Sequence, residues 1–301
     1  MNAPHLIPHP IPYQGSKRLI APTILTYCPR RVRRLVEPFA GSAAVSLAAA
    51  SRGRSESFWL NDAHAPLIRL WREILHRPQT LADAYTNLWE AQQGRERAFF
   101  DEVRARFNES HTPSDFMYLL ARCVKAAIRY NSAGEFNNTS DNRRLGARPA
   151  EMRQRIAGAA MLLGGRTRLT AHDYKRVLDE CECADLIYMD PPYQGVCGER
   201  DQRYAPKITH EEFCNELESL NRRGFMYLVS YDGRTGEKQY GDPLPAELNL
   251  LHLEIRAGRS TQATLLGRSC VTYESLYVSP TLRKRLPRHA NSAEQLELAF
   301  G

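Results

Sequence analysis

Four consecutive residues, Asp190–Pro191–Pro192–Tyr193, follow an apolar run, Asp185–Met189, that predicts a buried strand. Two successive prolines fix the backbone and remove two N–H donors, so we expect the carbonyl groups of Asp190 and Pro191 to point outward. A carboxylate, a carbonyl and the ring of Tyr193 would then form a receptor for an amino group on a planar heterocycle. The two oxygens would accept its N–H bonds and the ring would stack on its face.

Two earlier apolar runs also end in residues that suit a ligand. The first, Arg34–Glu37, leads into a turn where Gly41 permits close approach of a ligand and Ser42 is suited to cap the following helix. The second, Ser57–Leu60, ends in Asn61–Asp62, and a carboxylate there can accept two hydrogen bonds from a ribose diol. Taken singly, Gly41 as a turn glycine and Asp62 as a helix cap fit equally well.

Short apolar runs that alternate with helical stretches would position these residues. The runs are Arg34–Glu37, Ser57–Leu60, Thr167–Thr170, Asp185–Met189, Phe225–Ser230 and Leu250–Ile255, and the helical stretches include Ala43–Ala50, Pro66–Leu75 and Glu211–Asn221. This alternation predicts a doubly wound α/β fold, which binds ligands at the carboxyl ends of its strands. Strands around Leu250–Arg256 and Thr272–Ser279 lie too close for a crossover helix, so we expect an antiparallel pair at one sheet edge.

The alternation stops between residues 76 and 164. That segment is mostly helical, with candidate helices at Leu81–Glu90, Gly94–Phe107 and Ser114–Ile128, and it contains an irregular polar stretch, Arg129–Arg148. We therefore expect a discontinuous catalytic domain (residues 1–75 and 165–280), an inserted module (76–164) and a tail (281–301).

Composition narrows the class of protein. The 301 residues carry a formal net charge of +7, which suits a polyanionic partner but is weak support alone. The 7 cysteines form no CxxC pair, so we expect free thiols and no metal site. No apolar run is long enough to cross a bilayer, and we expect a cytoplasmic protein without membrane association.

Five elements, in order, resemble the DNA adenine N6-methyltransferases of the Dam type, in the alpha class of amino-methyltransferases. They are Tyr13–Gln14–Gly15–Ser16–Lys17, Glu37–Pro38–Phe39–Ala40–Gly41–Ser42–Ala43, Asn61–Asp62, Arg129–Tyr130–Asn131 with Gly134–Glu135–Phe136–Asn137, and Asp190–Pro191–Pro192–Tyr193. The chain departs from the family pattern at Ala43, where a second glycine is expected, and at Tyr13, where tryptophan is common. The stretch after Asn137 matches no particular recognition sequence.

The resemblance implies a Rossmann-like methyltransferase sheet that binds S-adenosyl-L-methionine. The residues it assigns to the cofactor are Tyr13, Lys17, Glu37, Phe39, Gly41, Asp62, Asp173 and Asp190. Among them Lys17 meets the methionine carboxylate and Asp62 the ribose. Asp173, with Tyr174, is the candidate for the adenine ring, although Asp173 fits a simple turn equally well.

The resemblance also implies which residues act on double-stranded DNA. Asp190, Pro191, Pro192 and Tyr193 are the catalytic residues, which act on an adenine flipped out of the duplex by positioning it for direct methyl transfer. The inserted module would be the target-recognition module. Its candidate base readers are Arg129, Asn131 and Asn137, and its candidate phosphate contacts are Arg143, Arg144 and Arg148.

Alternatives and partners remain open at this point. The main rivals are N4-cytosine methylation and a catalytically inactive DNA-binding protein on the same fold; a structured RNA substrate is weaker. The run Gln295–Phe300 resembles peptides that dock on bacterial sliding clamps, although we slightly favour packing on its own domain. We expect a monomer in a bacterial or phage-infected cytoplasm, associated with the nucleoid, and a cognate restriction enzyme is a further possible partner.

Overall fold

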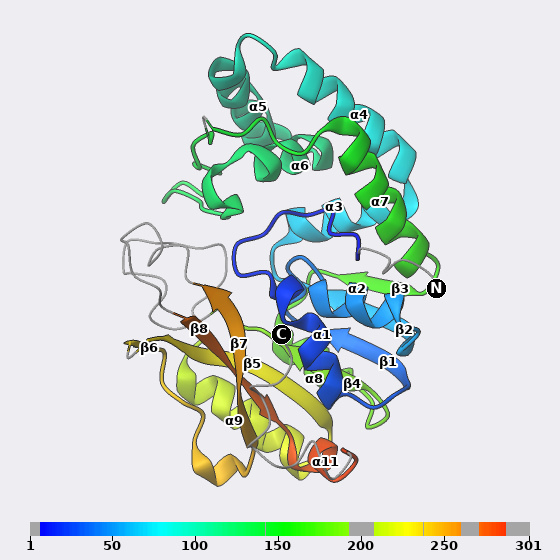
Figure 1. Ribbon diagram of the computed structural model, residues 1–301, viewed down its shortest axis with the longest axis vertical. Coiled ribbons are helices and arrows are strands. Elements are labelled where there is room, and N and C mark those ends of the chain that lie inside the picture. The colour runs from blue at the N-terminus through cyan, green and yellow to red at the C-terminus, as the bar shows by residue number, and fades with distance from the viewer. Residues whose placement is uncertain (1–6, 142, 193–207, 237, 260–270, 287–301) are drawn as a thin grey trace.

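The computed structural model describes residues 7–141, 143–192, 208–236, 238–259 and 271–286. A sheet of 8 strands forms its centre, in the order β3-β2-β1-β4-β5-β8-β7, with β6 paired to β5 (Figure 1). The strands are β1 Val32–Glu37, β2 Ser55–Asn61, β3 Thr167–Thr170, β4 Leu186–Met189, β5 Met226–Thr235, β6 Lys238–Tyr240, β7 Leu251–Arg259 and β8 Val271–Val278. The predicted α/β class is therefore confirmed.

Strands β1 to β5 run parallel, and their carboxyl ends meet at one edge of the sheet. Neighbouring β1 and β2 pair from Val32↔Ser55 to Glu37↔Leu60, so the residues that follow the two strands lie side by side. Strand β8 is antiparallel to both β5 and β7, and β7 is an outermost strand. This confirms the antiparallel pair expected at the sheet edge.

Helices cover both faces of the sheet because each central strand is apolar on both sides. On β1, Leu35 joins the core beneath α1 (Ala21–Ile24) and α2 (Ala44–Ser51), whereas Val36 joins the core beneath α8 (Tyr174–Asp179) and α9 (His210–Arg222). The same alternation separates Leu186 from Ile187 on β4. A strand buried in this way has both ends fixed by packing, which places its final residues accurately.

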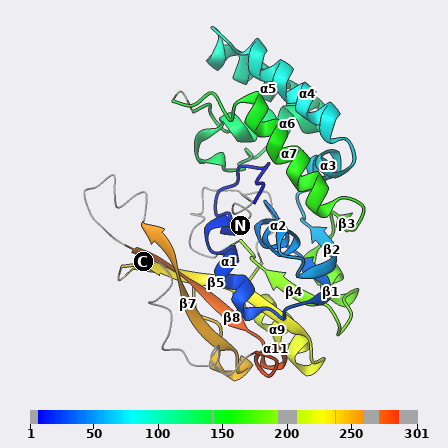
Figure 2. The ribbon, with the colours of Figure 1, turned by 45° about the vertical axis from the view of Figure 1, so that its right-hand side comes forward.

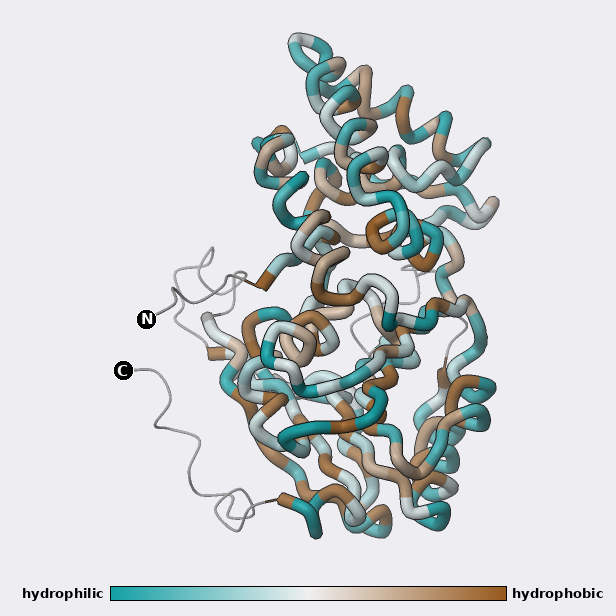
Figure 3. The backbone as a smooth tube through the Cα atoms, turned by 90° about the vertical axis from the view of Figure 1, so that its right-hand side faces the viewer, coloured by the Kyte–Doolittle hydropathy of each residue, from teal (hydrophilic) through white to brown (hydrophobic). Residues whose placement is uncertain are grey.

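Four helices form a layer beyond the sheet, above it in Figures 1 and 2. They are α4 Pro78–Ala91, α5 Glu96–Ser110, α6 Pro113–Arg122 and α7 Pro149–Leu163, and α3 Ala65–His76 leads into them. Hydrophilic and hydrophobic residues alternate along these helices in Figure 3, as expected of helices with one buried side. No helix among the described residues is both long and apolar enough to cross a membrane.

The predicted helix Ser114–Ile128 is wrong in its second half, because α6 ends at Arg122. Cys123 is extended and forms an isolated bridge with Ser140, which takes the chain out of the helix. A 3-10 turn follows at Val124–Ala126, where Lys125 has φ 59° and Ala126 has φ 49°. Short elements complete the described fold: the 3-10 turns Lys17–Leu19, Leu25–Tyr27 and Ala246–Leu248, and the helix α11 Pro280–Arg283.

Candidate active site

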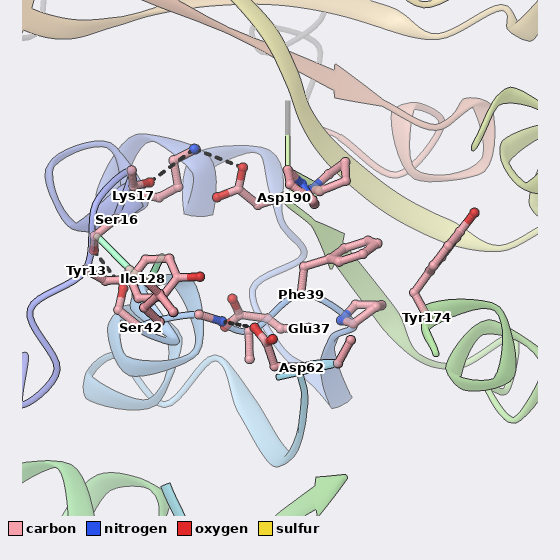
Figure 4. Close-up of a pocket in the computed structure, with 18 of the residues that line it drawn as sticks. Tyr13, Ser16, Lys17, Glu37, Phe39, Ser42, Asp62, Ile128, Tyr174 and Asp190 are labelled. Atoms are coloured by element: carbon pink, nitrogen blue, oxygen red, sulfur yellow. Dashed lines mark hydrogen bonds and ion pairs between the residues drawn. The ribbon is translucent and has the colours of Figure 1, made fainter. Parts of the chain in front are cut away.

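One cavity of about 340 Å³ lies at the carboxyl ends of β1, β2 and β4. All eight residues predicted for the cofactor line it, together with Pro191 and Pro192. They come from segments far apart in the sequence that the parallel strands bring to one edge of the sheet (Figure 4). Tyr193 lies outside the described residues, so its predicted stacking role stays a prediction.

The loop after β1 forms the floor of the cavity. Gly41 has φ 48°, and a Cβ there would lie 3.1 Å from the ring of Tyr13, so glycine serves both the turn and the close approach of that ring. Ala43 also has a left-handed backbone, with φ 48°. Because alanine is strained in that region, the departure from the second family glycine has a real conformational cost.

Ser42 does not cap the helix that follows, contrary to the sequence prediction. The N-cap position is Ala43, and no side chain caps α2. The Ser42 hydroxyl instead lies 2.7 Å from that of Ser16, and this hydrogen bond fastens the loop after β1 to the amino-terminal motif.

Two buried carboxylates, Glu37 and Asp62, face the middle of the cavity (Figure 4). Glu37 accepts a hydrogen bond of 2.7 Å from the backbone N–H of Ser46. Burial outweighs this bond and raises the pKa of Glu37 to about 8, with a smaller contribution from the nearby charge of Asp190.

Asp62 accepts backbone N–H bonds from Gly41 and His64, each 3.0 Å long, so it fixes the loops after β1 and β2. Burial raises the pKa of Asp62 to about 6 in spite of these two bonds. Asp62 therefore lines the cavity, and the alternative that it caps the following helix is wrong, because the N-cap position of α3 is His64 and no side chain caps it.

At one end of the cavity Lys17 makes an ion pair with the predicted catalytic carboxylate. The Nζ atom lies 2.9 Å from Asp190 Oδ1 and 3.3 Å from the carbonyl oxygen of Gly15. A third acceptor, Glu274 Oε2 on β8, lies 3.2 Å away. The sequence analysis did not identify Glu274. The feature that could have indicated it is that Glu274 is the one charged residue of the strand Val271–Val278.

Two aromatic rings mark the other end. Phe39 and Tyr174 lie 5.1 Å apart between ring centroids. Tyr174 Oη is buried and has no hydrogen-bond partner among the described residues. Asp173 lines the cavity and also caps α8 by accepting the Lys175 N–H at 2.9 Å, so its local role is that of a helix cap and not of a simple turn residue.

The candidate base readers do not line the cavity but lie in a small hairpin next to it. Tyr130 and Phe136 form an antiparallel bridge, and the exposed Arg129 and Asn137 are joined by a backbone bond of 3.1 Å. Asn131 differs from its neighbours because its side chain accepts the N–H groups of Ala133 and Glu135 and donates to the Glu135 carboxylate. These bonds shape the turn, and base reading by Asn131 would have to break them.

The phosphate candidates also lie away from the cavity. Arg143, Arg144 and Arg148 are exposed, and Arg144 is 3.9 Å from the carboxylate of Asp141.

Two contacts that the sequence did not predict join this polar stretch to the cavity. Ala126, Ala127 and Ile128 line the cavity wall, and the carbonyl of Ala126 accepts the Gln14 N–H at 3.1 Å. The Nε2 atom of the buried His64 ring lies 2.5 Å from the hydroxyl oxygen of Tyr130. Burial, followed by the charge of His111, lowers the pKa of His64 to about 3, so this ring is neutral.

Sequence comparisons identify the family of the chain. The model of the family described as D12 class N6 adenine-specific DNA methyltransferase matches residues 13–254, from the amino-terminal motif into β7. The chain belongs to this family.

Three relatives are similar over large parts of the chain. A DNA N-6-adenine-methyltransferase of Escherichia phage P1 is 30% identical over 73% of this chain, and the Escherichia coli retron Ec67 DNA adenine methylase is 29% identical over 61%. The chain spans 29% and 63% of the lengths of those two proteins. The Type II methyltransferase M1.LlaDCHI of Lactococcus lactis is 23% identical over 86% of this chain and 91% of its own length.

Proposed function

We propose that the chain transfers a methyl group from S-adenosyl-L-methionine to the N6 amino group of adenine in double-stranded DNA. One observation carries this proposal: Asp190, Pro191 and Pro192 lie at the rim of the same cavity as the eight candidate cofactor residues. The family and two of its relatives, named as adenine methylases, favour adenine over the N4-cytosine alternative.

The cavity fits a cofactor with a nucleoside at one end and an amino acid at the other. Its volume of about 340 Å³ lies in the range of small-molecule sites. The Phe39 and Tyr174 rings suit a purine, and the buried Tyr174 Oη needs a polar partner. Lys17 suits a carboxylate, and Asp62 is placed for ribose hydroxyls. When bound, S-adenosylmethionine supplies an electrophilic methyl group on a sulfonium.

The residues of the chain then act by position and charge. Asp190 accepts an N–H of the adenine amino group, and the Pro191–Pro192 segment fixes the direction of that carboxylate. Holding the amino group by its hydrogens keeps the nitrogen lone pair aimed at the methyl group. Catalysis of this kind needs no covalent bond to the protein and depends on preorganised geometry.

The surrounding segments would supply recognition. We propose that residues 76–164 form the target-recognition module on a catalytic domain of residues 1–75 and 165–280. Support comes from the exposed Arg129 and Asn137, side by side next to the cavity, and from the exposed Arg143 and Arg144. The relative named a Type II methyltransferase supports a place in a restriction–modification system. The sliding-clamp segment Gln295–Phe300 lies outside the described residues.

The test incubates the purified protein with unmethylated genomic DNA and S-adenosylmethionine and then measures methylated nucleosides by mass spectrometry. We expect N6-methyladenine from the wild type, and a loss of at least about 100-fold in Asp190→Ala, since removing one group that stabilises the transition state typically costs that much. Asp179→Ala is the matched control, because the Asp179 side chain is 78% exposed on α8 and should leave the rate unchanged.

Other products would change the conclusion. N4-methylcytosine would keep the chemistry and overturn the base. Cofactor binding without any methylated base would support the inactive DNA-binding alternative.

A further inference from the structure

Glu274 is held beside the cavity by the geometry of β8. It pairs with Gly233 on β5 and Ile255 on β7, and it has the same strand parity as Leu276, which lies in the core beneath α1 and α2. The side chain therefore points to the face that carries the amino-terminal motif.

An irregularity in the sheet fixes this position further. The register of β5 against β8 shifts between Ser230 and Gly233. A Cβ on Gly233 would lie only 2.6 Å from the Tyr273 carbonyl oxygen, so glycine allows β8 to approach closely at the residue before Glu274. Bulges of this kind often redirect a side chain next to an active site.

The contact between Glu274 and Lys17 is one of charge. Oε2 lies 3.2 Å from Lys17 Nζ, yet it has no hydrogen-bond geometry to any described residue. Lys17 is only 4% exposed, so water screens the pair weakly. The Lys17 ammonium thus lies between two carboxylates, Asp190 at 2.9 Å and Glu274 at 3.2 Å.

We propose that Glu274 is a positioning residue for methyl transfer, which acts through Lys17 on Asp190. This inference rests on the proposed function. By sharing the positive charge of Lys17, Glu274 keeps that ammonium from neutralising Asp190 alone. The Asp190 carboxylate then stays a strong acceptor for the adenine amino group while Lys17 holds it in place.

Glu274→Gln tests the inference because it removes the charge and keeps the shape. At saturating DNA and S-adenosylmethionine we expect the methyl-transfer rate to fall about tenfold, with the KM of the cofactor changed less than about threefold. Glu254→Gln is the matched control: it removes a carboxylate from the neighbouring strand β7, where Glu254 pairs with Arg234 at 2.6 Å on the surface. Its rate should stay within about twofold of the wild type.

A second readout needs neither DNA nor cofactor. The sequence has 6 lysines, so a spectrum of the protein with 13Cε-labelled lysine is simple to assign, with Lys17→Arg identifying the Lys17 signal. We expect that signal to move in Glu274→Gln and to stay in place in Glu254→Gln. A loss of structure would move other lysine signals as well.

The outcomes separate the inference from the proposed function. An inactive wild type would overturn both. If the wild type is active, three results would overturn the inference alone. They are a methyl-transfer rate of Glu274→Gln within twofold of the wild type, an effect of that substitution confined to the KM, and a Lys17 signal that does not move.

Discussion

The cavity and the polar stretch 129–148 hold their side chains in place by different means. In the cavity Glu37, Asp62 and Asp190 follow buried parallel strands, so the packing of the sheet sets their positions. In the polar stretch, Asn131 and Asn138 hold the chain by bonds from side chain to backbone, and the arginines are exposed. The proposed chemistry would therefore rest on residues that the packing of the sheet holds, and the proposed recognition on a part whose shape depends on a few local bonds.

The sharpest expected difference between the two regions is in pH dependence. Glu37 is buried with a pKa of about 8, whereas the arginines of the stretch are exposed to solvent. Under the proposed function, the sulfonium charge of the cofactor would favour ionised Glu37, and below pH 8 binding would have to remove the proton that Glu37 carries. We expect cofactor affinity, measured by calorimetry, to rise up to about tenfold per pH unit between pH 6 and 8 and then to level off. In Glu37→Gln the dependence should be flat above pH 7 and should keep only the part near pH 6 that the Asp62 pKa of about 6 contributes; a slope that persists above pH 7 would assign it to another group.

The same carboxyl has a defined effect on stability. Its pKa is higher in the folded chain than the ordinary value of 4.5, so the folded state binds the proton more tightly. The contribution of Glu37 to the free energy of unfolding is therefore greatest below pH 4.5 and declines as the pH rises to about 8.

Within the polar stretch, the arginines should divide into two kinds. Arg129→Ala should weaken binding to the recognition sequence by about 1–3 kcal/mol and relax discrimination at one base pair. Arg143→Ala should weaken binding to all DNA sequences alike and reduce the slope of log affinity against log salt concentration by about 1. Fluorescence anisotropy on cognate and scrambled duplexes at several salt concentrations measures both. Equal effects of the two substitutions would contradict this division.

The smallest expected effect concerns the bond that joins the two regions. Tyr130→Phe removes the hydroxyl 2.5 Å from His64 and leaves a buried ring nitrogen without that partner. We expect the free energy of unfolding, from urea denaturation, to fall by about 1–3 kcal/mol. Cofactor affinity should stay within twofold, because Asp62 is held by the backbone of His64 and not by its ring. Tyr273→Phe, on β8, is the control; a cofactor affinity that fell with Tyr130→Phe would mean that the regions do not act separately.

Sequence patterns predicted the strand ends well because they depend on local signals. The apolar run before Asp190 and the turn at Gly41 identify both the strand and its end, and the resemblance assigned the residues that line the cavity. Contacts between distant segments gave no such signal. The single acidic residue of β8 marks Glu274 but does not indicate its partner Lys17, and no local pattern indicates the His64–Tyr130 bond, because both contacts depend on how separate elements pack.

Local patterns also failed where the backbone adopts unfavourable conformations. The residues after α6 look helical by composition, yet Lys125 and Ala126 take left-handed conformations that glycine or asparagine would adopt more readily. Ala43 also has a left-handed backbone conformation, and only the family pattern, which has glycine at that position, indicated it.

The contact between Lys17 and Glu274 also has a consequence for synthesis of the chain. Lys17 is made before its second carboxylate, Glu274, and at about 5–20 residues per second roughly 13–50 s of translation separate the two residues. In the last part of that interval, after residue 190 has been made, the nascent chain holds the amino-terminal motif and the end of β4 without the strand that balances their charges. The charge network of the pocket is therefore completed only when β8 has been made, so a ribosome that stalls before residue 274 leaves it unfinished.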